Sequence, residues 1–182
     1  LDEIHRNDPN LKAIHFARNF GHEAATTAGL DYASGQGIVI IDADLQDPPE
    51  LIPNMIDKWK QGFEVVYGKR KQRKGESAFK KTTSAFFYRF LQRMTEINMP
   101  ADVGDFRLID RKVADALKNI REKNRYMRGI ISWVGFRQTA IEFVREERWA
   151  GETKYNVKKL LRLAWDAITA FSYKPLKIAT YL

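Results

Sequence analysis

The stretch "IVIIDADLQDPPE", from Ile38 to Glu50, places four apolar residues directly before a group of carboxylates and two prolines. A continuous apolar run is typical of a strand in a parallel sheet that is covered on both faces. In open sheets of this kind, ligands bind outside the carboxyl ends of the strands. The stretch therefore fits two interpretations: a strand end that holds a metal ion, or a strand followed by a polar turn and a helix cap.

Asp42, Asp44 and Gln46 follow the apolar run at alternate positions, so their side chains point the same way if the chain stays extended. Carboxylate and amide oxygens are hard ligands that suit Mg²⁺ or Mn²⁺, ions that also accept oxygens from a phosphate. A bare Asp-x-Asp pair is common by chance, so its place after the strand carries the prediction. Asp47 has a structural interpretation as an N-cap before the two prolines.

Strands and helices alternate around this stretch. We expect strands over residues 11–17, 37–43 and 63–70, a helix from about His22 to near Gly35, and a second helix over residues 48–62 with Gly62 just beyond its end. The β-α-β-α-β order predicts a parallel α/β sheet.

The rest of the chain continues with mixed elements. We expect a basic loop over residues 69–77, a long helix over 78–97, a turn and short strand over 102–111, helices over 112–120 and 124–135, a strand and glycine turn over 139–155, and a helix over 156–171. The helices over 78–97 and 156–171 combine basic and aromatic residues, which suits an anionic bilayer surface. The alternative is that they pack on the core of the domain.

Composition narrows the class of protein. The 182 residues suffice for one domain, or one domain with an appendage, and 44% of them are hydrophobic. The absence of cysteine excludes disulfides and thiolate metal sites. A net charge of +8 favours an anionic partner: nucleic acid, a phosphorylated substrate or an anionic membrane surface.

Four motifs in order carry a resemblance to a known family: "ARNFGHEAATTAGLDYASG", "DADLQDPPEL", "GDFRLIDR" and "RWAGETKY". With them the chain resembles family 2 glycosyltransferases of the GT-A fold, in the branch of polyprenyl-phosphate glycosyltransferases that includes bactoprenol glucosyltransferases and, more distantly, dolichyl-phosphate mannose synthase. The resemblance implies a Rossmann-like, mostly parallel sheet flanked by helices.

The chain departs from that family at both ends, because it lacks the N-terminal strands and the two C-terminal transmembrane helices. We therefore interpret it as part of a longer protein. We expect an N-terminally truncated catalytic domain over residues 1–155. Residues 156–182 would form an interfacial, membrane-facing helix and the start of a truncated transmembrane segment.

The resemblance also implies roles for single residues. Asp42, Asp44 and Gln46 would hold the metal and the diphosphate of a sugar nucleotide, which makes Asp44 a catalytic residue. Nucleotide contacts are expected from Arg18, Asn19 and Gly21, and the alternative there is a polar turn before a helix. His22 is expected to start that helix rather than to act as a catalyst.

Further residues would meet phosphates or the acceptor. The expected phosphate contacts are Arg70, Lys81, Arg107, Arg148 and Lys154. Asp105 is expected to position the acceptor or to act as a weak general base. A strong base is not required, since a phosphate monoester has a second pKa of about 6 and is largely a dianion at neutral pH. The alternatives are a strand-end turn for Asp105 and pairing with Asp105 for Arg107.

The sequence thus predicts a metal-dependent, inverting transfer of a hexose, first of all glucose from UDP-glucose, to a polyprenyl phosphate such as undecaprenyl phosphate. The expected location is the cytoplasmic face of the cell membrane. The sequence does not decide whether the protein forms a homo-oligomer. Three alternatives remain: a soluble transferase acting on a polysaccharide or protein, a non-catalytic truncated membrane adaptor, and a nucleic-acid-binding module. The last gives the aspartate cluster no role and matches no known nucleic-acid-binding motif.

Overall fold

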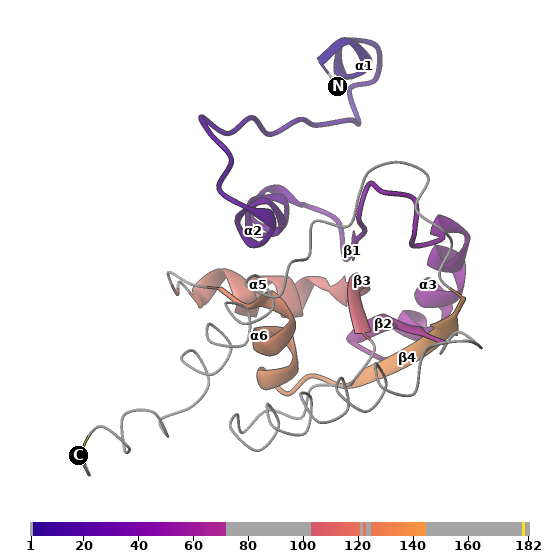
Figure 1. Ribbon diagram of the computed structural model, residues 1–182. Helices are drawn as coiled ribbons and strands as arrows, with labels where there is room; N and C mark the ends of the chain where they lie inside the picture. Colours follow the sequence, from indigo (N-terminus) through magenta and orange to yellow (C-terminus); the bar gives the residue numbers. More distant parts are fainter. Residues whose placement is uncertain (1, 72–102, 121, 123–124, 145–179, 181–182) are drawn as a thin grey trace, which may run out of the picture.

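The computed structural model describes residues 2–71, 103–120, 122, 125–144 and 180 (Figure 1). Its sheet has four strands in the spatial order β1-β3-β2-β4. The strands are β1 (Gly37–Ile40), β2 (Val65–Arg70), β3 (Val103–Asp110) and β4 (Gln138–Phe143). Each lies in a segment for which the sequence predicts a strand, except that β4 begins one residue before its predicted range.

Strand β3 runs against its two neighbours. It pairs antiparallel with β1 on one side and with β2 on the other, while β2 and β4 pair in parallel. Three strands therefore share one direction, which agrees with a mostly parallel sheet. The pairing of neighbouring strands, however, is not mostly parallel in the described part of the sheet. Strand β3 lies between β1 and β2 and pairs antiparallel with both, so the prediction of a parallel sheet is wrong for these pairs.

Helices cover both faces of the sheet (Figure 1). The helical elements are α1 (Asp2–Asn7), α2 (His22–Tyr32), η1 (Pro49–Leu51), α3 (Ile52–Lys60), α5 (Arg111–Asn119) and α6 (Met127–Trp133). On one face α2, α5 and α6 pack around Val65 and Ile109. On the other, Met55 of α3 packs with Val66 and Phe106. Successive residues of a strand point to opposite faces, so Val65 and Val66 belong to different halves of the core.

Local sequence signals set the ends of the helices. The predicted helix over residues 48–62 is present as η1 and α3, and Gly62 follows it with φ of 91°, a left-handed conformation that glycine adopts without strain. Asp110 caps α5, since its Oδ1 accepts the Lys112 N–H at 2.9 Å. Its Oδ2 accepts the Trp59 indole N–H at 2.7 Å, which ties α3 to the start of α5.

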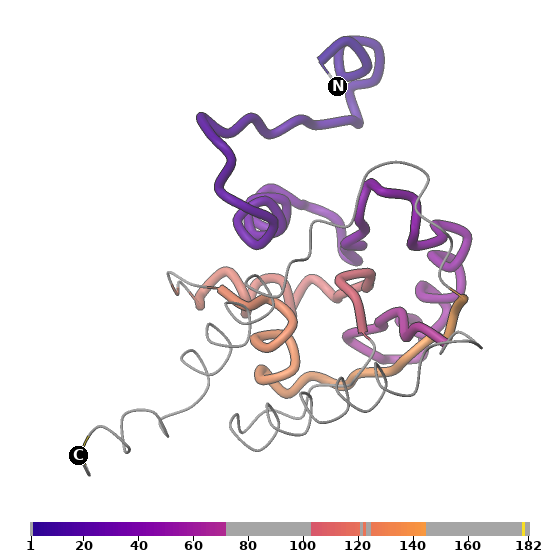
Figure 2. The backbone as a smooth tube through the Cα atoms, in the orientation of Figure 1, coloured from indigo at the N-terminus to yellow at the C-terminus, as the bar shows by residue number. Residues whose placement is uncertain are grey.

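The strand predicted over residues 11–17 is wrong, because this segment has no regular secondary structure. The tube in Figure 2 shows α1 and the following segment running apart from the sheet. A strand needs a neighbour for its backbone hydrogen bonds, and within the described residues β1 pairs only with β3.

Several predictions fall outside the described residues. These are the basic loop beyond Lys71, the helices over 78–97 and 156–171, the glycine turn after β4 and the boundary at residue 155. None of the helices in the described part of the chain combines the length and apolar character needed to cross a membrane.

Candidate active site

Three polar residues from separate strands gather at one edge of the sheet. Ile40 ends β1 opposite Arg107 of β3, so Asp42, two residues past Ile40, lies near Asp105 at the start of β3. Arg70 ends β2 at the same edge, where its guanidinium lies against Gly104. The edge is the carboxyl end of β1 and β2, where ligands bind in open α/β sheets.

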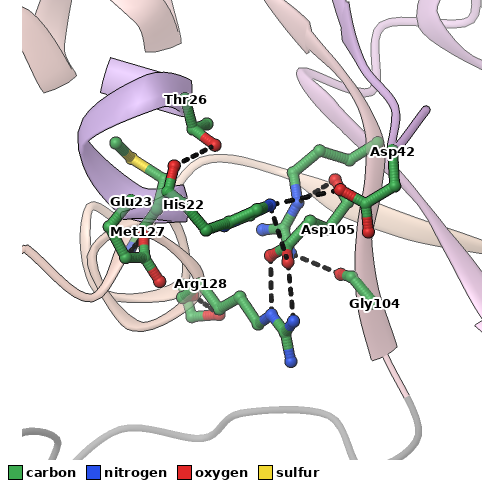
Figure 3. A network of polar contacts seen from close by, with 10 residues as sticks. His22, Glu23, Thr26, Asp42, Gly104, Asp105, Met127 and Arg128 are labelled. Atoms are coloured by element: carbon green, nitrogen blue, oxygen red, sulfur yellow. Dashed lines mark hydrogen bonds and ion pairs between the residues drawn. The ribbon is translucent and has the colours of Figure 1, made fainter. Parts of the chain in front are cut away.

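His22 joins the two carboxylates. Figure 3 shows its ring reaching from the first residue of α2 toward both of them. Its Nε2 donates to Asp42 Oδ1 at 3.1 Å and lies 3.8 Å from Asp105 Oδ2. The hydrogen bond with Asp42 raises the pKa of His22 against its partial burial, and the same bond lowers the pKa of Asp42. The pair therefore favours an imidazolium beside a carboxylate.

Arg128 of α6 holds Asp105 at two points. Its Nε donates to Oδ1 and its Nη2 donates to Oδ2, each at 2.6 Å. Burial of Asp105 opposes ionisation, but the Arg128 hydrogen bonds and positive charge outweigh it and keep the pKa of Asp105 below its ordinary value. Asp105 is therefore a carboxylate at neutral pH.

Arg107 lies beneath this carboxylate, with only 4% of its surface exposed. Its guanidinium donates to the backbone oxygens of Gly104 at 2.8 Å and Asp105 at 3.3 Å. Burial lowers its pKa to about 10, so it remains a cation at neutral pH. Arg70, Arg107 and Arg128 thus lie close to these carboxylates, and guanidinium groups are suited to phosphate oxygens.

The loop after β1 does not stay extended. Ala43 and Asp44 form a turn, and Leu45 has φ of 59°. The condition under which Asp42, Asp44 and Gln46 would point the same way, an extended chain, is therefore not met. Asp44 Oδ1 instead accepts the Gln46 N–H at 3.2 Å.

The prediction of Asp47 as an N-cap is also wrong. Pro48 occupies the cap position of η1, and no side chain makes a capping hydrogen bond there. Asp47 is instead buried, with 2% of its surface exposed. A polar residue directly before a helix suggested capping, and its burial could not be read from the local sequence.

The predicted nucleotide contacts lie on the exposed turn before α2. Asn19 Oδ1 accepts the Gly21 N–H at 2.9 Å, and Gly21 has φ of 92°. The Arg18 guanidinium lies over the Phe20 ring, 4.2 Å from its centre. These contacts agree with a polar turn and leave the nucleotide role a prediction. Three further predicted site residues, Lys81, Arg148 and Lys154, lie outside the described residues.

The donor atoms at this edge fit a divalent cation. One donor atom each from His22, Asp42 and Asp105 lies within 4.8 Å of the others, and His22 would ligate an ion only after losing the proton that it donates to Asp42. Asp42 is the most suitable ligand, because about a third of its side chain is exposed. Asp105 is less suitable, since both of its oxygens already accept bonds from Arg128. Asp44 is not part of this group, since the chain turns at Ala43 and Asp44 and the Asp44 Oδ1 accepts the Gln46 N–H.

Two residues of this site were not predicted from the sequence. Arg128 lies in a segment predicted only as a helix, and its pairing with Asp105 depends on how α6 packs beside β3. His22 was predicted as the first residue of a helix, which is correct. Its second role, the contact with Asp42, joins residues 20 positions apart and leaves no local pattern.

In open α/β domains, ligands bind outside the carboxyl ends of the strands, and the aspartates and arginines of this chain lie at that edge. The family is shown by sequence comparison. The sequence model of glycosyl transferase family 2 matches residues 1–118, and the chain belongs to this family. The four-stranded mixed sheet is consistent with the GT-A fold.

Several curated proteins are similar over nearly the whole chain. The uncharacterized glycosyltransferase YkcC of Bacillus subtilis is 64% identical over 96% of this chain and 54% of its own length. The prophage bactoprenol glucosyl transferase homolog of Escherichia coli is 45% identical over 97% of this chain and 58% of its own length. The bactoprenol glucosyl transferase of Shigella phage SfV is 44% identical over 97% and 57%. The chain thus spans little more than half the length of these relatives.

Proposed function

We propose that this chain carries the catalytic site of an inverting glycosyltransferase that moves a hexose, first of all glucose, from a nucleotide diphosphate sugar to a polyprenyl phosphate. The main support is the meeting of Asp42 and Asp105 with three arginines at one sheet edge. Relatives named bactoprenol glucosyl transferase, at 43–45% identity, support the choice of glucose and a lipid acceptor.

The reaction joins one phosphate oxygen of the acceptor to the anomeric carbon. The bond from that carbon to the diphosphate breaks at the same time, and the nucleoside diphosphate leaves with the bonding electrons. The acceptor phosphate is largely a dianion at neutral pH, since its second pKa is about 6. Asp105, already ionised and held by Arg128, then orients the acceptor and is not required to remove a proton.

Asp42 and Asp44, with Gln46, would hold Mg²⁺ or Mn²⁺. When bound, such an ion neutralises charge on the leaving diphosphate. Arg70, with Lys81, Arg107, Arg148 and Lys154, would bind the phosphates of donor and acceptor, because cationic groups, and a guanidinium above all, form strong hydrogen bonds with phosphate oxygens. We place the reaction at the cytoplasmic face of the cell membrane, where a polyprenyl phosphate exposes its headgroup.

The test is transfer from radiolabelled UDP-glucose by the full-length protein in detergent, with undecaprenyl phosphate as acceptor. The label is expected in the organic phase, and Asp44→Ala is expected to reduce the rate by about 100-fold or more, in the range of a lost charge-stabilising group. Asp57→Ala, an exposed carboxylate of α3, is the matched control and is expected to retain the rate.

Three results would contradict parts of the proposal. Transfer by Asp44→Ala at the wild-type rate would remove the metal assignment. Transfer to a soluble polysaccharide or protein, with none to the lipid, would support the soluble transferase instead. Absence of UDP and Mn²⁺ binding in calorimetry would support the non-catalytic adaptor.

A further inference from the structure

The contact between Arg128 and Asp105 has the geometry of a guanidinium fork on a carboxylate. The two hydrogen bonds are parallel, each 2.6 Å long, and join α6 to the start of β3. The side chain of Asp105 is 12% exposed and that of Arg128 is 30% exposed. A fork of this kind fixes both the position and the plane of the carboxylate, whereas a lysine would supply only a point charge.

Glu23 holds the beginning of α6 in place. Its Oε2 accepts the backbone N–H of Met127, the residue before Arg128, at 3.1 Å. Glu23 is partly buried, and this burial raises the pKa of its carboxyl group. Glu23 and His22 are neighbours on the first turn of α2. Figure 3 shows His22 directed toward Asp42 and Asp105, and Glu23 beside Met127.

The first turn of α2 thus touches two parts of the site at once. His22 contacts Asp42 and approaches Asp105, while Glu23 fixes the residue that precedes Arg128. A shift of α6 along its axis would carry Arg128 away from Asp105. The Glu23 contact opposes that shift.

We propose that Arg128 is a positioning residue for hexose transfer that fixes the Asp105 carboxylate against the acceptor, and that Glu23 holds α6 in the register that this requires. The proposal rests on the proposed function, because Asp105 is taken to orient the acceptor. Each carboxylate oxygen has two lone pairs, so the fork leaves one on each oxygen that can accept a hydrogen bond or a proton. Arg128 therefore acts through Asp105 without itself contacting the reacting atoms.

The experiment measures kcat and KM for hexose transfer by the full-length protein and its variants at saturating acceptor. For Arg128→Ala we expect kcat to fall about 100-fold, as for a reacting group displaced by about 1 Å, with the donor KM unchanged within about 2-fold. Arg128→Lys retains the charge but not the fork, so we expect only partial recovery. Free guanidinium ion is expected to restore part of the kcat of Arg128→Ala.

Matched controls separate positioning from folding. Arg125→Ala removes a nearby guanidinium that donates to the carbonyls of Leu117 and Ile120, so we expect lower stability with no rescue by guanidinium. Glu23→Gln keeps an oxygen that accepts the Met127 N–H, and we expect a near wild-type kcat. Glu23→Ala removes that oxygen, and we expect a lower kcat that guanidinium does not restore.

The outcomes distinguish this proposal from the proposed function. If the wild type transfers hexose and Arg128→Ala retains its kcat, the positioning role is wrong and the proposed function stands. A loss in Arg128→Ala that free guanidinium does not restore also contradicts positioning, because it indicates general damage to the fold. If the wild type transfers no hexose to the lipid, the proposed function is wrong, and the positioning role falls with it.

Discussion

Replacing Gly68 by alanine tests the packing that supports the site. Gly68 lies in β2, where the pairing with β3 shifts register between Tyr67 and Lys69, two residues before Arg70. A Cβ at Gly68 would lie 2.8 Å from Phe143 Cε1 and 3.1 Å from Phe106 Cδ1. Since carbon atoms pack best at about 3.5–4.0 Å, the nearer ring must move by roughly 0.7 Å.

The rings cannot move independently. Phe106 is fully buried and Phe143 is 5% exposed, and they pack edge to face with centres 6.1 Å apart. Overpacking of this kind costs about 1–3 kcal/mol, and the reduced entropy of the unfolded chain returns about 0.4–1 kcal/mol. We therefore expect Gly68→Ala to lower the free energy of unfolding by about 1–2 kcal/mol.

The assay is urea unfolding of the full-length protein, followed by circular dichroism, with midpoint and slope compared between variants. Gly29→Ala is the control, because a Cβ at Gly29 meets nothing within 4 Å and Gly29 lies inside α2. We expect that variant to be more stable by about 0.5–1 kcal/mol. If Gly68→Ala were as stable as the wild type, the account of the packing between β2 and β4 would be wrong.

Two further predictions concern contacts that hold elements together. Trp59→Phe removes the indole N–H bonded to Asp110, and we expect thermal unfolding to report a loss of about 1–2 kcal/mol, the usual range for a hydrogen bond to a charged group that is partly exposed. The Glu64 carboxylate accepts hydrogen bonds from the Lys112 ammonium and from the Arg137 N–H, and these bonds hold its pKa below the ordinary value. The contribution of Glu64 to the free energy of unfolding is therefore present at neutral pH and is lost as the pH falls through that lowered pKa. Glu64→Gln should therefore unfold at a lower temperature than the wild type at neutral pH and at the same temperature in acid; a constant difference at all pH values would contradict the ionic origin.

Local signals in the sequence predicted much of the fold. The apolar run from Ile38, the helix that ends before Gly62 and the alternating pattern of β4 each have a local cause. The place of β3 between β1 and β2 has none, because strand order depends on contacts between distant segments. The pattern of residues 11–17 also suggested a strand, but a pattern alone supplies no neighbour to pair with.

The candidate site was also predicted only in part, because some of its residues carry a local signal and others meet only through contacts between distant segments. Asp42 and Asp105 stand at strand ends, which a sequence can indicate. Arg128 pairs with a residue 23 positions earlier, and its segment shows only helical periodicity. The chain turns at Ala43 and Asp44 and does not stay extended. The spacing of Asp42 and Asp44 in the sequence does not specify the backbone conformation between them.

The most direct test of the central claim is the movement of label from UDP-glucose into the organic phase by the wild-type, full-length protein. We expect label to enter the organic phase only when undecaprenyl phosphate is present, and we expect Asp44→Ala nearly to abolish this transfer. Label that stays in the aqueous phase with the lipid present, or that reaches the lipid equally fast with Asp44→Ala, would contradict it.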